Sequence, residues 1–265
     1  MLTKNGEPIA SLDDWHRLVR PKGHDDWKDH YSAKETARAW VAASPSLPRD
    51  VETLFENHAE FGIPTTWHAE PNVLLKFDAF PDEPHNAHLF LLAKDRRGPY
   101  VVVVAAVTDE AFGHTIAQER AAAIRRKRLN GKSNGERRID QLESAIFASK
   151  PEEQDALEPL RYHLLTATAG AIRAAIGSKS ARTVLLVQEF VTPATRDARH
   201  ATNAADLNAF VARLTLGSIP QIVPGRLYGP IRVTGSPLFD VVPDLYIGRV
   251  RRDIRPIGEA RHSER

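Results

Sequence analysis

The chain has 265 residues, 42% of them hydrophobic, and a formal net charge of +2, so it can bury a sizeable core and its composition alone does not indicate nucleic acid. It contains no cysteine, which excludes a disulfide framework, cysteine-ligated zinc and thiol catalysis. No apolar run approaches the roughly 18 to 20 residues that span a bilayer, and the first residues lack the apolar segment of a signal peptide. We therefore expect a cytoplasmic protein with no membrane partner.

Short helices are predicted in the first sixty residues, over 11–18, 32–43 and 48–55. Ser11 can cap the first, and Ser32 with Glu35 has the spacing of a capping box for the second. Four aromatic residues accompany these helices, and we expect them to pack in the core rather than to contact a ligand: Trp15, Trp27, Tyr31 and Trp40.

The stretch 86–113 is the predicted centre of the fold. Strands are expected at 72–80, 88–93 and 100–108, and a tight Arg-Arg-Gly-Pro turn joins the last two. Val101–Val107 is an unbroken run of valine and alanine, which is typical of a strand covered on both faces.

The rest of the chain alternates helices with strands. Helices are predicted at 115–129, 136–148 and 156–176, and a buried strand at 182–191. A further helix capped by Asn203 is expected next, followed by short strands at 227–233 and 245–250.

This order predicts a single α/β domain over 1–265 with a mixed central sheet flanked by helices. Within it we expect N-terminal helices over about 11–60, a core over about 70–192, a C-terminal extension over 193–250 and a frayed tail over 251–265.

Familiar active-site motifs are absent from the sequence. There is no Walker motif, no G-x-G-x-x-G, no G-x-S-x-G and no H-E-x-x-H. His85 and His88 would point to opposite faces of a strand, so they could share zinc only if the chain turned between them. Glu110 and Glu119 are interpreted as a solvated strand end and a helix-surface residue.

The order of a helix, three adjacent strands, a helix and a fourth strand resembles the αβββαβ core of the PD-(D/E)XK, or restriction-endonuclease-like, nuclease superfamily. The chain is also similar to an uncharacterised bacterial family with that core. This resemblance lies in an early Asp-Asp-Trp and several later stretches: Tyr31–Ala33, Asn86–Leu89, Asp109–Gly113, Arg161–Ala169 and Val184–Phe190.

The resemblance implies a specific chemistry. An Asp on the second strand and a Glu on the third would hold a divalent cation against the scissile phosphate, and a Lys two residues after the Glu would activate the attacking water. In this sequence His88 stands at the Asp position, Ala105 at the Glu position and Val107 at the Lys position. His163 replaces a glutamine of the long-helix pattern. The two carboxylates that would bind the metal and the positively charged lysine are therefore missing together.

The first of three hypotheses follows from this loss. The chain would be a nuclease-like protein that no longer cleaves and that binds nucleic acid, or another partner, through the basic segment Arg120–Arg138. This segment holds eight basic residues and one acid, and a solvated helix face is its alternative interpretation. The expected contact residues are Arg120, Arg125, Arg126, Lys127, Arg128 and Lys132.

The second hypothesis is a rewired metal-dependent nuclease. Asp109 would point to the same face of the third strand as Ala105 and Val107, about 7 Å beyond Val107. From there it could bind Mg²⁺ or Mn²⁺ together with His88, joined by His163 or Glu119. The third is a protein-interaction or immunity-type module for which the fold is only a platform. No cofactor is expected unless the rewired enzyme is active.

Overall fold

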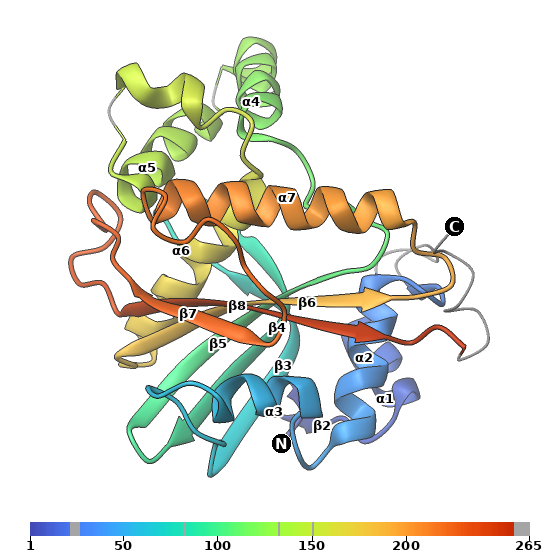
Figure 1. The fold of residues 1–265 in the computed structure, drawn as a ribbon. Helices are drawn as coiled ribbons and strands as arrows, with labels where there is room; N and C mark the ends of the chain where they lie inside the picture. The colour runs from blue at the N-terminus through green and yellow to red at the C-terminus, as the bar shows by residue number, and fades with distance from the viewer. Residues whose placement is uncertain (22–26, 82, 132, 150, 257–265) are drawn as a thin grey trace, which may run out of the picture.

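A computed structural model of the chain describes residues 1–21, 27–81, 83–131, 133–149 and 151–256 (Figure 1). The strands are β1 Thr3–Lys4, β2 Glu7–Pro8, β3 Thr66–Leu75, β4 His85–Asp95, β5 Gly98–Val107, β6 Arg182–Val191, β7 Arg226–Ile231 and β8 Asp244–Asp253. The α-helices are α1 Leu12–Val19, α2 Ser32–Ala43, α3 Arg49–Glu56, α4 Ile116–Asn130, α5 Gly135–Phe147, α6 Tyr162–Gly177 and α7 Asp197–Leu214, and a 3₁₀ helix spans Pro151–Ala156.

Six strands form one mixed sheet in the order β3-β4-β5-β6-β8-β7. β4 runs antiparallel to β3 and β5, the strands β5, β6 and β8 are parallel, and β7 closes the edge antiparallel to β8. The predicted mixed α/β sheet flanked by helices is confirmed. Because β8 lies beside β6, the segment after residue 192 contributes a strand to the main sheet.

Strand β5 is covered on both faces, as its valine-rich sequence predicts. Val102, Val104 and Ala106 join the apolar cluster that contains residues of α1, α2 and α3. Ala105 and Val107 join the cluster on the other face, with residues of α5, α6 and α7.

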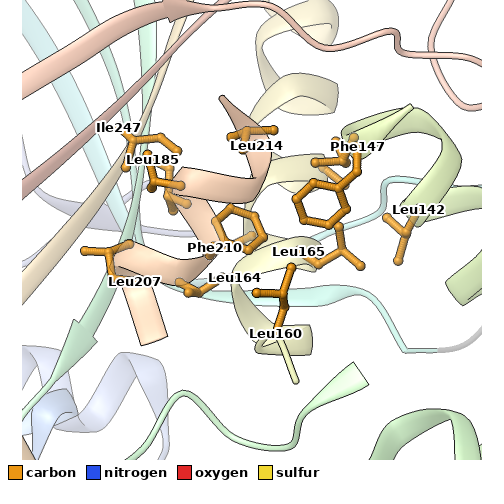
Figure 2. Close-up of a cluster of buried hydrophobic side chains, with 14 of the residues drawn as sticks. Leu142, Phe147, Leu160, Leu164, Leu165, Leu185, Leu207, Phe210, Leu214 and Ile247 are labelled. Atoms are coloured by element: carbon orange, nitrogen blue, oxygen red, sulfur yellow. The ribbon is translucent and has the colours of Figure 1, made fainter. Parts of the chain in front are cut away.

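The second cluster is the larger part of the core. Figure 2 shows Phe210 of α7, Leu165 of α6 and Phe147 of α5 packed together, with Leu185 of β6 and Ile247 of β8 beside them. The rings of Phe147 and Phe210 meet edge to face with centroids 5.4 Å apart.

Several predicted helix starts are corrected by the structure. The predicted helix over 156–176 begins only at Tyr162, because Pro159 lacks an amide hydrogen and restricts the residue before it. The helix expected to be capped by Asn203 starts seven residues earlier, at Asp197 with Arg196 as its N-cap, and the Asn203 amide instead donates to the backbone carbonyl of Glu110 (2.8 Å).

The predicted capping box of α2 is also wrong, although the helix itself is present. Ser32 lies inside the helix and its N-cap is Tyr31, which makes no side-chain capping bond. Ser32 bonds Glu110 instead, and Glu35 accepts from the backbone N–H of His30 (2.8 Å). The helix predicted over 115–129 is confirmed as α4, and Thr115 with Gln118 forms a capping box at its start.

The edge strand β3 lies earlier in the sequence than predicted. It covers Thr66–Leu75 rather than 72–80, because residues 66–71 pair with β4 and Ala69 also bridges Leu2. The predicted frayed tail is strand as far as Asp253, and its last nine residues, 257–265, lie outside the described part of the chain.

Candidate functional site

The central strands β4 and β5 separate at one end. Their registered pairs end at Leu89 opposite Val104, yet β4 extends back to His85 and β5 forward to Val107. The backbone N–H of Ala106 donates to Nδ1 of His88 (3.3 Å) instead of to a strand carbonyl. The separation opens space in the sheet at the position where the resemblance places the nuclease site.

A cavity of about 560 Å³ occupies this end of the sheet. Its wall includes Trp15 of α1, with Trp27 and Tyr31 from the segment before α2. The rest of the wall comes from α2, from the strands β3, β4 and β5, from the segment after β5 and from α6, and the residues used below are Ser32, Ala33, His88, Val107, Glu110 and His163. Positions 88 and 107, which the resemblance aligns with the nuclease Asp and Lys, therefore line a cavity that also has aromatic residues in its wall.

The carboxylate of Glu110 accepts four hydrogen bonds. Its Oε1 accepts from the backbone N–H and the hydroxyl of Ser32, both at 3.0 Å, and its Oε2 accepts from the N–H (2.8 Å) and the hydroxyl of Thr108. Burial raises the pKa of Glu110, but these bonds outweigh burial and hold the pKa below its ordinary value. Glu110 is thus an anion at neutral pH and not the solvated strand end predicted from the sequence.

His88 belongs to the same network. Because its Nδ1 accepts from Ala106, the neutral ring carries its proton on Nε2 and donates to the Ser32 hydroxyl (3.4 Å). A histidine that donates to a serine cannot remove that serine's proton. The geometry therefore argues against a serine–histidine nucleophile in this cavity.

Three histidine rings gather where β4 meets α6. The ring of His163 lies 4.9 Å from that of His85 and 6.4 Å from that of His88, measured between centroids. Burial lowers the pKa of all three, and the neighbouring His88 helps to lower that of His163 to about 4. These side chains are neutral at pH 7.

Asp109 has a different partner from the one the second hypothesis requires. β5 ends at Val107, so strand alternation does not extend to Asp109, and its carboxylate pairs with Arg196 at the start of α7 (2.9 Å). In the part of the chain that the structure describes, no group of three His, Asp or Glu side chains is placed to hold a metal ion. Glu119, the other candidate ligand, pairs with Arg126 (2.9 Å) and His114 (3.3 Å).

The sequence places this chain in a family. Residues 8–242 match the family described as Domain of unknown function (DUF6946), a span that includes every residue named in the cavity wall. The chain belongs to this family. No curated protein and no solved structure matches it.

In this DUF6946 protein, much of the basic segment is neutralised within the fold. Arg120 binds Asp140 (2.6 Å) and Glu143 (2.8 Å), and Lys127 binds Glu136 (3.1 Å). Arg126 also contacts Glu83 (3.2 Å), in addition to Glu119. The predicted contact residue Lys132 lies outside the described residues.

Two of the predicted contact residues keep their charge available. Arg125 and Arg128 are exposed on the outer side of α4 and make no ion pair within the described parts of the chain. In Figure 1, α4 and α5 stand away from the sheet beyond α6 and α7.

None of the helices that the structure describes is long and apolar enough to cross a membrane.

Sequence reasoning missed a second buried charged network in this DUF6946 fold. Glu189 at the end of β6 binds His200 of α7 on one oxygen and Arg249 of β8 on the other (3.0 and 2.5 Å). All three side chains are buried, and the guanidinium of Arg249 offsets the charge of the carboxylate. This network joins β6, α7 and β8 and lies outside the cavity wall.

Proposed function

We propose that this chain is a binding protein on a nuclease-like fold that has lost metal-dependent cleavage, and that it holds its ligand in the cavity between β4 and β5. The observation that carries this proposal is the wall of the cavity. Where a nuclease needs two carboxylates and a lysine, the wall holds His88 and Val107, with Ala105 buried behind it. The cavity has the size and the largely apolar lining of a small-molecule site.

Electrostatics also disfavours phosphate chemistry at this position. Among the described residues of the wall, no lysine or arginine is present, and Glu110 carries a negative charge. A scissile phosphate would meet this carboxylate without a metal ion or a cation to offset the repulsion. The cavity therefore suits a ligand that is not an anion.

The first prediction is that the protein cleaves no nucleic acid. Labelled single- and double-stranded DNA and RNA should remain intact with Mg²⁺, Mn²⁺ or Zn²⁺, because the described wall of the cavity holds a single carboxylate and no pair that could position a metal-bound water. The assay is gel electrophoresis after prolonged incubation. Metal-dependent cleavage that disappears in both His88→Ala and Asp109→Ala would overturn the proposal in favour of the rewired enzyme.

Ligand binding in the cavity can be tested with a blocking substitution. Ala33 lines the cavity near the start of α2, so Ala33→Phe should fill the space and abolish binding of any compound found by thermal-shift screening of a fragment library. The matched control is Ala121→Phe, which places the same ring at an exposed position of α4 and should leave binding unchanged. Equal binding by both variants would place the ligand elsewhere.

Nucleic-acid contact through α4 is the second candidate, favoured by the exposed pair Arg125 and Arg128. Two phosphate contacts predict weak binding, with a slope of about −2 when the logarithm of the association constant is plotted against that of the salt concentration. The double variant Arg125→Ala/Arg128→Ala should abolish this binding in fluorescence anisotropy. Binding that survives the double variant would exclude this face, and no binding at low salt would favour a protein partner.

A further inference from the structure

Among the described residues of the cavity wall, Glu110 supplies the negative charge, and no lysine or arginine there offsets it. His88 and His163 contribute no positive charge at neutral pH, because burial lowers their pKa. A bound cation would therefore be attracted and an anion repelled by this charge, and the largely apolar wall strengthens both effects.

The hydrogen bonds of Glu110 restrict what kind of cation fits. A carboxylate has about four acceptor positions. Those of Glu110 are taken by two N–H groups and two hydroxyls, from Ser32 and Thr108. An ammonium ligand that must donate N–H bonds finds no vacant acceptor there, whereas a quaternary ammonium group has no N–H to satisfy and needs only the charge.

Aromatic rings supply the other half of a cation site. Trp15, Trp27 and Tyr31 line the same cavity, and the faces of such rings attract quaternary ammonium groups electrostatically. Tyr31 immediately precedes Ser32, whose N–H and hydroxyl bind Glu110, so one helix start brings a ring and the carboxylate to the cavity. Trp27 is half-buried and Tyr31 is 42% exposed, so a ligand can reach them.

We infer that the ligand is a small organic cation with a quaternary ammonium group, held by Glu110 through charge and by Trp15, Trp27 and Tyr31 through their rings. This inference rests on the proposed function of the cavity. The inference specifies the chemical class of the ligand. It also gives Glu110 a role as the opposite charge, which Glu110 can fill although its hydrogen-bond acceptors are already occupied.

Isothermal titration calorimetry with matched probes tests the inference. Choline should bind at least about tenfold more tightly than its neutral analogue 3,3-dimethyl-1-butanol, since only choline is charged. Ethanolamine should bind more weakly than choline because its N–H groups find no acceptor on Glu110. Adenosine monophosphate serves as the anionic probe and should show no binding in the cavity.

Variants separate charge from packing. Glu110→Gln should reduce choline affinity about tenfold and leave the affinity for the neutral analogue unchanged. Because Glu110 is partly buried and this variant could unfold, Tyr31→Leu provides a second test at an exposed side chain, and it should weaken choline more than the neutral analogue. Circular dichroism confirms that each variant is folded.

The outcomes distinguish the ligand class from the existence of the site. Equal affinity for choline and its neutral analogue, with both lost in Ala33→Phe, would keep the binding cavity and overturn the cation. Preferential binding of adenosine monophosphate in the cavity would overturn the cation as well. If Ala33→Phe abolishes the binding of no tested compound, whether choline or a fragment, the proposed function and the inference both fail.

Discussion

Replacing Arg182 with methionine should lower the free energy of unfolding by about 3 to 5 kcal/mol, which is the usual cost of removing one partner from a buried ion pair. Arg182 begins β6 and binds Asp95 of β4 through two hydrogen bonds, 3.0 and 2.7 Å long. Both residues are buried, at 6% and 5% exposure. Methionine fills part of the space but leaves the Asp95 carboxylate without its cation.

The environment of Arg182 explains why no neighbour can compensate for its loss. Its guanidinium also donates to the carbonyls of Gly98 (2.9 Å) and Glu60, and it lies over the rings of Phe61 and Tyr100, 4.9 and 5.2 Å from their centroids. Burial raises the pKa of Asp95, and the bonds from Arg182, together with those from the backbone N–H groups of Arg97 and Gly62, more than reverse that rise. Without Arg182 the carboxylate keeps only the two backbone N–H groups and must remain charged without a cation or take up a proton.

Urea denaturation of the two proteins at pH 7 measures this effect. The matched control is Arg97→Met in the adjacent turn, where the side chain is exposed and its ion pair with Glu60 spans 3.2 Å. Exposed pairs contribute about 0 to 1 kcal/mol, so this control should change little. A cost for Arg182→Met that is no larger than the cost for Arg97→Met would contradict the prediction.

Local sequence patterns predicted the centre of the fold well, and the reasons are physical. Arg182–Val191 is a strand over the predicted range, because the apolar run Val184–Val187 at its centre is typical of a strand buried on both faces. The helix that begins after Thr115 was predictable because its capping box lies within four consecutive residues. In contrast, the range of β3 depends on pairing with Leu2 and with β4, which no local pattern contains.

The candidate site was predictable only in part, for the same reason. The resemblance located His88, Val107 and His163, which line the cavity. The resemblance did not reveal that Glu110 is a buried hydrogen-bond acceptor, because one of its donors, Ser32, lies 78 residues away in the sequence. The other donor, Thr108, lies two residues before Glu110 and was the one local signal. Trp15 and Trp40 are buried in the core as predicted, whereas the prediction is wrong for Tyr31, which is exposed and lines the cavity together with Trp27.

Acid should destabilise the protein through its histidine cluster, by about 2 kcal/mol from His163 alone between pH 7.5 and pH 4.5. The pKa of His163 is lowered from an ordinary 6.5 to about 4 by burial and by His88. Between these values the unfolded chain binds a proton that the folded chain does not, so stability is full above pH 6.5 and declines as the pH falls toward 4. Lowered pKa values of His85 and His88 act in the same direction.

His163→Phe isolates this contribution, because phenylalanine keeps a ring beside His85 and His88 but cannot take up a proton. Urea denaturation at pH 7.5, 6.0, 5.0 and 4.5 should show a smaller loss of stability for the variant than for the wild type, by about 2 kcal/mol at pH 4.5. Glu143, whose pKa is raised by burial, has the opposite effect on stability, but it is present in both proteins and cancels in the difference. Parallel curves for the two proteins would mean that His163 titrates normally and that the cluster is open to water. A difference of the expected size would show that His163 is neutral at pH 7 and adds no positive charge to the cavity wall that it shares with Glu110.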